Sequence, residues 1–101
     1  MQKLVRDRIP EIIRQQGKVP KTRIADKKEY WSFLKEKLVE EVNEFLKDET
    51  TEELADILEV IYSICKFKNW DLEEIEKIRI KKRKERGGFE KGVILIENEG
   101  L

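Results

Sequence analysis

Residues 37–56, which read KLVEEVNEFLKDETTEELAD, decide both the fold and the candidate site. Glu41 is followed three residues later by Glu44, and the same spacing separates Glu53 from Asp56. Because residues three apart lie on the same side of a helix, each pair is displayed by one helical turn. The polar break between the pairs indicates two helices joined by a short turn. In an antiparallel hairpin all four carboxylates can converge, and a hard divalent cation, which prefers oxygen ligands, would relieve their repulsion.

About four helices are expected along the chain, which places it in the all-α class. The first precedes a stop at Gly17 and has Asp7 as its predicted cap. The second begins at a capping box formed by Asp26 and Glu29 and runs to about Lys47. Within this helix the apolar residues recur at helical spacing and predict one core-facing stripe.

The third helix is expected over about residues 51–68, with Thr50 and Glu53 as its capping pattern. Its side chains are apolar nearly all round, and such a helix is buried on most sides. In a chain of 101 residues this indicates that a second copy supplies part of the cover. We therefore expect oligomerisation, as a homodimer or a dimer of dimers, to complete the core.

The fourth helix is predicted to start at a capping box formed by Asp71 and Glu74 and to end at the Gly-Gly pair at 87–88. The apolar run VILI at 93–96 is long enough for one strand or a docking arm. The expected architecture is a helical bundle with a short extended C-terminal tail, forming a single domain over residues 1–101.

The composition excludes several classes of protein. Basic and acidic residues both number 22, so no net charge attracts nucleic acid or a membrane surface as a partner. Histidine is absent, which removes imidazole catalysis, zinc fingers and zinc-dependent deaminases. The single cysteine, Cys65, lies in an apolar run and is typical of a core residue in a reducing compartment. No signal peptide or membrane-spanning stretch is visible, so we expect a cytoplasmic protein.

Two motifs carry a resemblance to a known family. KLVEEVNEF (37–45) followed by EELADILEVI (52–61) resembles the all-α nucleotide pyrophosphatase superfamily, which includes MazG and phosphoribosyl-ATP pyrophosphatase. KLVRDRIPEII (3–13) and KKRKERGGFEKGVIL (81–95) are similar to its small MazG-like subgroup, so the resemblance covers nearly the whole chain. It implies an α-helical fold, dependence on a divalent metal, and cleavage of a nucleoside triphosphate to the monophosphate and pyrophosphate.

The resemblance also implies roles for individual residues. The family's metal ligands, for Mg²⁺ or for Mn²⁺ in its place, map onto Glu41, Glu44, Glu53 and Asp56. The acidic and basic residues that precede them in the family motif map onto Glu40 and Lys37.

Chemical reasoning from the residues agrees with these roles. With no histidine present, Glu40, Glu41 or Glu44 is expected to position or deprotonate the attacking water. Helical phase places Glu40 on the face opposite Glu41, which makes it the weaker metal ligand. Lys37 is the best-placed cation for the triphosphate charge that Mg²⁺ leaves uncompensated.

Other residues are weaker candidates for substrate binding. The expected phosphate-binding side chains at the two ends of the chain are Lys3, Arg6, Arg8, Arg83, Arg86 and Lys91. An aromatic slot for the base could be formed by Tyr30, Trp31, Trp70 and Phe89, among which Trp31 and Trp70 are the main candidates. Aromatic residues at helix-core positions more often serve packing.

Two alternatives remain open at this point. One is a protein of the same fold that binds a nucleotide or metal as a regulator without catalysis. The other is a small helical nucleic-acid-binding protein that uses the basic run at 79–86, although the zero net charge argues against it. The identity of the nucleotide is not determined by the sequence.

Overall fold

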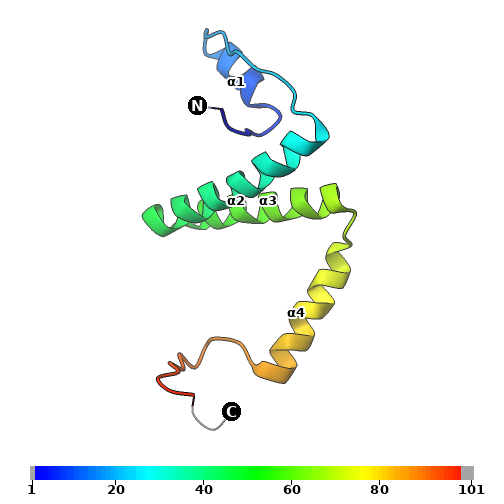
Figure 1. Cartoon of the computed structure of the whole chain (residues 1–101). Helices are drawn as coiled ribbons and strands as arrows, with labels where there is room; N and C mark the ends of the chain where they lie inside the picture. Colours follow the sequence, from blue (N-terminus) through cyan, green and yellow to red (C-terminus); the bar gives the residue numbers. More distant parts are fainter. Residues whose placement is uncertain (1, 99–101) are drawn as a thin grey trace. The chain divides into compact units, whose positions relative to one another are not determined.

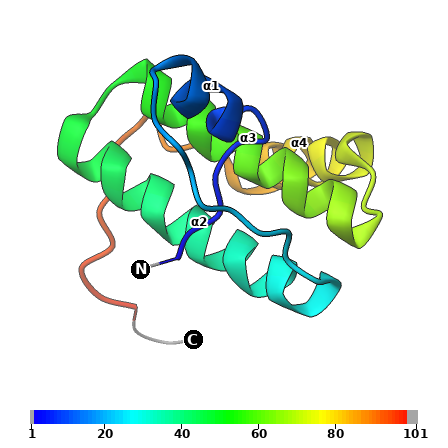
Figure 2. The same cartoon turned by 90° about the horizontal axis from the view of Figure 1, so that it is seen from above.

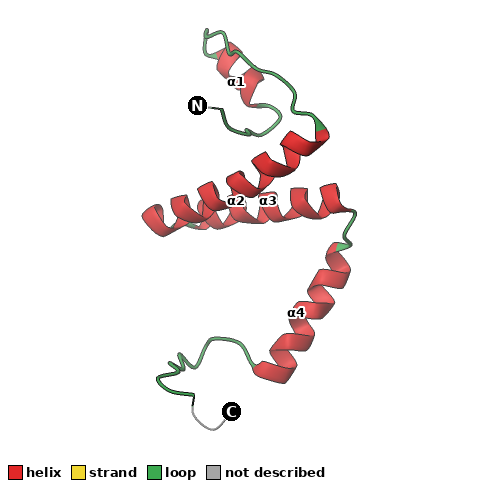
Figure 3. Ribbon diagram, in the orientation of Figure 1, coloured by secondary structure: helices red, strands yellow, loops and turns green. Residues whose placement is uncertain are grey.

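The computed structural model describes residues 2–98, and these contain four α-helices and no strand (Figure 3). The prediction of an all-α protein of about four helices is therefore confirmed. The chain divides into two compact units, Met1–Asn69 and Trp70–Leu101, which are described separately below. The assignment of residues 1–101 to a single functional domain stays a prediction.

The first unit contains α1 (Ile9–Gln15), α2 (Lys27–Asp48) and α3 (Thr51–Lys68). Helices α2 and α3 pack against each other and lie side by side in Figures 1 and 2. Only two residues connect them, and the first, Glu49, has the left-handed backbone conformation with φ 52°. The predicted helical hairpin is therefore present.

Capping side chains explain where α2 and α3 begin. The Asp26 carboxylate accepts a hydrogen bond from the Glu29 backbone N–H at 2.9 Å, and the Glu29 side chain accepts one from Asp26 N–H. This reciprocal capping box confirms the predicted start of α2. At α3 the Thr50 hydroxyl accepts from the Glu53 N–H at 3.3 Å. Left-handed Asn69 ends α3.

The predicted cap of α1 was wrong, and at the fourth helix the predicted N-cap Asp71 is confirmed but its predicted capping partner is wrong. Helix α1 starts after Arg8, not Asp7, and no side chain caps it. The proline in its first turn already fixes a helical φ and offers no N–H, so this end has less need of a cap. At the start of the fourth helix, Asp71 accepts from Glu73 N–H rather than from Glu74.

Few side chains of the first unit are fully buried. The buried apolar residues are Leu34, with 1% of its surface exposed, Val60 and Cys65. Trp31 stacks on Phe67 with the ring centroids 5.4 Å apart and the planes 2° apart. Trp31, a predicted base-slot residue, therefore takes part in the packing of α2 against α3.

An apolar surface remains open on the α2–α3 hairpin. Between about two-fifths and two-thirds of each of its side chains is exposed. We call it the hairpin apolar face; on α2 it comprises Val39, Val42 and Leu46, and on α3 Leu54, Leu58 and Tyr62. We predicted that the rest of the chain leaves part of α3 uncovered, and the exposed side chains of α3 agree with that prediction.

The second unit contains α4 (Leu72–Arg86) and the chain that follows it. Gly87, at φ 83°, ends the helix as predicted. Arg83 pairs with Glu90 at 2.9 Å and so holds the loop that follows Gly87 close to the last turn. Residues 93–96 are exposed and form no strand, so the alternative of one strand is not realised among the described residues. None of the described helices has the length and hydropathy needed to cross a membrane.

Candidate metal centre

The hairpin brings carboxylates from both acidic motifs together. Glu41 projects from α2, and Glu53 and Asp56 project from α3, with one carboxylate oxygen of each within 4.8 Å of the others. Glu41 is buried, with only 9% of its surface exposed. Because the two helices join through a two-residue turn, the last part of α2 lies beside the first part of α3. Three of the four carboxylates predicted to converge, Glu41, Glu53 and Asp56, therefore lie together, whereas Glu44 is not in this group.

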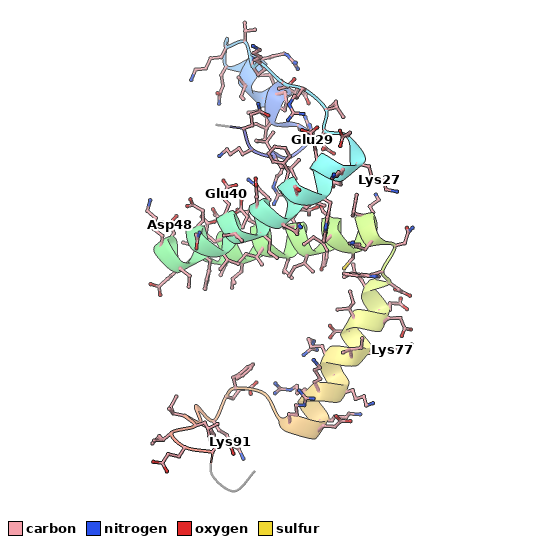
Figure 4. All side chains as sticks on the ribbon, in the orientation of Figure 1. Lys27, Glu29, Glu40, Asp48, Lys77 and Lys91 are labelled. Carbon is pink, nitrogen blue, oxygen red and sulfur yellow. The ribbon has the colours of Figure 1, made fainter. Side chains whose placement is uncertain are left out.

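A second group of three carboxylates adjoins the first. Oxygens of Glu44, Asp48 and Glu53 also lie within 4.8 Å of one another, and Glu53 belongs to both groups. Asp48 lies at the C-terminal end of α2 (Figure 4). Asp48 was not predicted from the sequence, although its position one helical turn after Glu44 was a signal that could have found it.

The crowding of negative charge is visible at Glu53. Partial removal from water raises the pKa of Glu53, and the charges of Asp48, Asp56, Glu44 and Glu41 raise it further. The negative charge of the Glu53 carboxylate is therefore disfavoured at this position. A bound cation would reverse that effect.

Lys37 lies beside the first group of carboxylates. Its ammonium is 3.2 Å from Oε1 of Glu41 and 3.2 Å from Oε2 of Glu40. Glu40 also accepts from Lys3 at 3.4 Å. Burial acts to raise the pKa of Glu40, but Lys37 and Lys3 outweigh it, so the pKa lies below its usual range. Among the described residues, Glu40 belongs to neither group of three.

The N-terminal segment, residues 2–8, adds positive charge to the same region. The Arg6 guanidinium donates to Oδ1 of Asp56 at 2.8 Å and lies 3.9 Å from Oε1 of Glu59. Together with Lys3 on Glu40, this brings two of the predicted phosphate-binding side chains to the acidic motifs. Figure 4 shows Glu40 on α2, on the side where the N-terminal segment lies.

The other predicted phosphate- and base-binding residues include one at the start of α1 and several in the second unit. Arg8 pairs with Glu11 within the first turn of α1, at 3.0 Å. Five others belong to the second unit, on α4 and the segments that flank it: Trp70, Arg83, Arg86, Phe89 and Lys91. Figure 4 labels Lys91 in the loop that follows α4. Their assignment to the site stays a prediction.

The donor set fits a hard divalent cation. All the donors are carboxylate oxygens, the ligands that Mg²⁺ and Mn²⁺ prefer. Two ligand oxygens on one Mg²⁺ are at most about 4.2 Å apart, because each bond is about 2.1 Å long. Within each group the oxygens lie within 4.8 Å of one another, so small side-chain rotations would bring them to this spacing. Glu41, Glu53 and Asp56 could therefore hold one cation, and Glu44 and Asp48 form a second group with Glu53.

Comparisons with known proteins add little to this geometry. No protein-family model and no solved structure matches the chain. The chain is similar to an uncharacterized protein of Mycolicibacterium smegmatis (strain ATCC 700084 / mc(2)155), with 50% identity over 50 residues. That match covers 50% of this chain and 51% of the relative, so the chain spans about half the length of the relative it matches. The function is therefore inferred from the residues of the site.

Proposed function

We propose that the protein is a MazG-like nucleotide pyrophosphohydrolase that uses Mg²⁺ to cleave a nucleoside triphosphate to the monophosphate and pyrophosphate. The observation that carries this proposal is the convergence of Glu41, Glu53 and Asp56 across the α2–α3 hairpin, with Lys37 beside them. Partly buried carboxylates that face one another are costly without a cation. The sequence resemblance of the two motifs to the superfamily supports the reaction type.

Each side chain has a proposed task. Glu41, Glu53 and Asp56, with Glu44 or Asp48 completing the set, would hold the cation. When bound, Mg²⁺ would neutralise the phosphate chain and lower the pKa of a coordinated water. Glu40 lies next to this group and shares the Lys37 ammonium with Glu41, at 3.2 Å from each. Glu40 or Glu41 is therefore the proposed base.

The basic side chains would bind the phosphates. Lys37 is held against Glu40 and Glu41 at 3.2 Å from each, so its charge is fixed in position before substrate arrives. Fixed positive charge of this kind stabilises the additional negative charge of a phosphoryl-transfer transition state. Arg6 is exposed and would add to this charge once a cation has taken over Asp56, and exposed Lys3 would add its charge from beside Glu40.

We propose that a second copy of the chain covers the hairpin apolar face, giving a homodimer or a dimer of dimers in the cytoplasm. Three buried apolar side chains make a very small core for a domain of this length. Leu46, Leu54 and Leu58 on this face would gain stability on leaving water, at roughly 25 cal/mol per Å² of apolar area. Sedimentation of the whole chain tests this proposal, since a monomer at micromolar concentration would contradict it.

The reaction itself is tested with a panel of nucleoside triphosphates and phosphoribosyl-ATP, each assayed for pyrophosphate release with Mg²⁺, with Mn²⁺ and with EDTA. We expect release with at least one substrate, which stops in EDTA. Nucleotide binding without release would favour a non-catalytic regulator of the same fold. That alternative has one observation in its favour, because Arg6 already balances Asp56 without a metal. Salt-sensitive binding of nucleic acid without pyrophosphate release would favour a small helical nucleic-acid-binding protein.

A further inference from the structure

A cavity of about 460 Å³ lies between the N-terminal segment and one side of α2. Its walls include Gln2, Lys3 and Leu4 from the segment, and Phe33, Lys37 and Glu40 from α2. Its volume lies within the roughly 300–1,000 Å³ that small-molecule sites occupy. Glu36 of α2 also lines it, so Leu4 and Phe33 supply the apolar side chains among mostly polar and charged ones. The sequence analysis did not predict this cavity, because it depends on how the N-terminal segment folds back onto α2.

One end of the cavity presents an aromatic ring and an oriented amide. The Arg23 guanidinium lies 5.9 Å from the centre of the Phe33 ring. Arg23 also donates two hydrogen bonds to Oε1 of Gln2, at 2.7 and 3.1 Å, and pairs with Glu29 at 2.8 Å. Since the oxygen of the Gln2 amide is already engaged, its NH₂ group is left to donate to a ligand.

The other end of the cavity adjoins the candidate metal centre. Lys37 and Glu40 line the cavity, and the Lys37 ammonium also contacts Glu41, which belongs to the first carboxylate group. Phe33 and Lys37 are four residues apart on α2, so their side chains occupy the same face of the helix. A molecule that stacks on Phe33 therefore extends toward Lys37 and the carboxylates when it carries a phosphate chain.

We propose that this cavity binds the nucleoside end of the substrate, with the base stacked on Phe33, a base acceptor atom bonded to the Gln2 amide, and the phosphates at Lys3 and Lys37. This inference rests on the proposed function and gives it a base-binding site. It assigns Phe33 rather than Trp31 or Trp70 to the base. Trp31 is stacked on Phe67 between α2 and α3, whereas Phe33, which has the Arg23 guanidinium over its ring, lines the cavity. Arg23 acts as a positioning residue that holds the amide of Gln2.

The test measures binding of nucleoside monophosphates to the whole chain in EDTA, where no turnover occurs, by calorimetry and by amide chemical shifts. AMP, GMP, CMP and UMP are titrated against the wild type, Phe33→Leu and Phe33→Tyr. For the nucleotide that binds, we expect Phe33→Leu to raise Kd by roughly ten-fold, since base–aromatic stacking is lost. Phe33→Tyr, which keeps the ring, should stay within about two-fold of the wild type. Inorganic pyrophosphate should bind all three proteins equally.

Gln2→Ala provides a second variant. Because Gln2 lies in an exposed segment, this variant should fold even if Phe33→Leu does not. It should weaken binding of the same monophosphate by a few-fold, as expected for one lost hydrogen bond.

Absence of monophosphate binding, or equal binding by the wild type and both loss variants, would overturn the inference. Pyrophosphate release with an unchanged KM in Phe33→Leu would overturn it while leaving the proposed function intact. Monophosphate binding that depends on Phe33, without any pyrophosphate release, would overturn only the proposed function.

Discussion

Lys37 and Glu41 form an ion pair one turn apart on α2, with Nζ 3.2 Å from Oε1, and both side chains are largely shielded from solvent. The pair connects the two halves of the proposed site, since Glu41 belongs to the carboxylate group and Lys37 lines the cavity beside it. A charge held in this way needs little reorganisation when a phosphate approaches.

Replacing Lys37 with methionine removes this charge but keeps the aliphatic stem. We expect kcat/KM for the triphosphate to fall by roughly ten-fold or more, as for other preorganised transition-state contacts. Stability should fall by about 1–3 kcal/mol, because Glu41 is left buried without its partner. Steady-state assays and urea unfolding measure the two effects.

Lys77→Met is the matched control for Lys37→Met. Lys77 pairs with Glu74 at 3.2 Å, three residues away on α4, and is exposed (Figure 4). This variant should change neither activity nor stability beyond about 0.5 kcal/mol. An equal loss of activity in both lysine variants would contradict a specific role for Lys37.

Arg6→Ala should tighten metal binding and weaken substrate binding. Arg6 donates to Oδ1 of Asp56 at 2.8 Å, so it competes with a cation for that carboxylate. We expect the Kd for Mn²⁺ to fall by roughly two- to five-fold, because an exposed pair of this kind contributes up to about 1 kcal/mol. KM for the triphosphate should rise. Calorimetric titration with Mn²⁺ measures the first effect, and Arg8→Ala, which breaks only the pair with Glu11, should leave it unchanged.

Asp26→Ala should destabilise the fold through the start of α2. Asp26 accepts from Glu29 N–H at 2.9 Å, and loss of such a cap costs about 1 kcal/mol. Asp26→Asn retains a side-chain acceptor and should remain close to the wild type. Urea unfolding compares the three proteins, and equal stability of Asp26→Ala and the wild type would show that this end of α2 does not contribute to the cooperative fold.

Stability should depend on pH through Glu29. The hydrogen bond from Arg23, and then that from the Asp26 backbone, hold the pKa of Glu29 below its usual range. A carboxyl with a depressed folded-state pKa contributes stability above its unfolded pKa of about 4.3, and that contribution is lost as pH falls through the folded value. Glu29→Gln keeps a capping-box side chain but loses the charge.

Urea unfolding of the wild type and Glu29→Gln at pH 7, 5 and 3 measures the contribution of Glu29. The wild type should be the more stable at pH 7, and the difference should shrink toward pH 3. A difference that stays constant across this range would show that the pair with Arg23 has no energetic effect.

Local signals in the sequence predicted the helices well. Asp26 with Glu29, Thr50, and Gly87 each act within one turn of their own helix, and the corresponding helix ends lie where expected. The predicted cap of α1 was wrong by one residue, because Arg8 and not Asp7 occupies the N-cap position. The proline in the first turn also reduces the need for a side-chain cap. The choice between two neighbouring N-cap residues depends on small differences in free energy that a residue pattern does not reveal.

The candidate site was predictable only in part. Glu41 and Asp56 were found because helical spacing and a short turn bring them together. The contacts from Arg6 to Asp56 and from Lys3 to Glu40 span 50 and 37 residues, and they depend on the path of the N-terminal segment. The cavity at Phe33 depends on the same path. No local periodicity encodes these contacts, so they had to come from the structure.

The most direct test of the central claim is pyrophosphate release by Glu53→Gln, with Glu73→Gln on α4 as the control. Glu53 belongs to both carboxylate groups, so its loss should reduce release by roughly 100-fold or more, since even outer partners of a metal contribute about 10–100-fold. The raised pKa of Glu53 shows that its charge is disfavoured without a cation, so the metal-free stability of the variant should equal or exceed that of the wild type. Release by Glu53→Gln equal to that of Glu73→Gln and the wild type would contradict a metal-dependent pyrophosphohydrolase at this site.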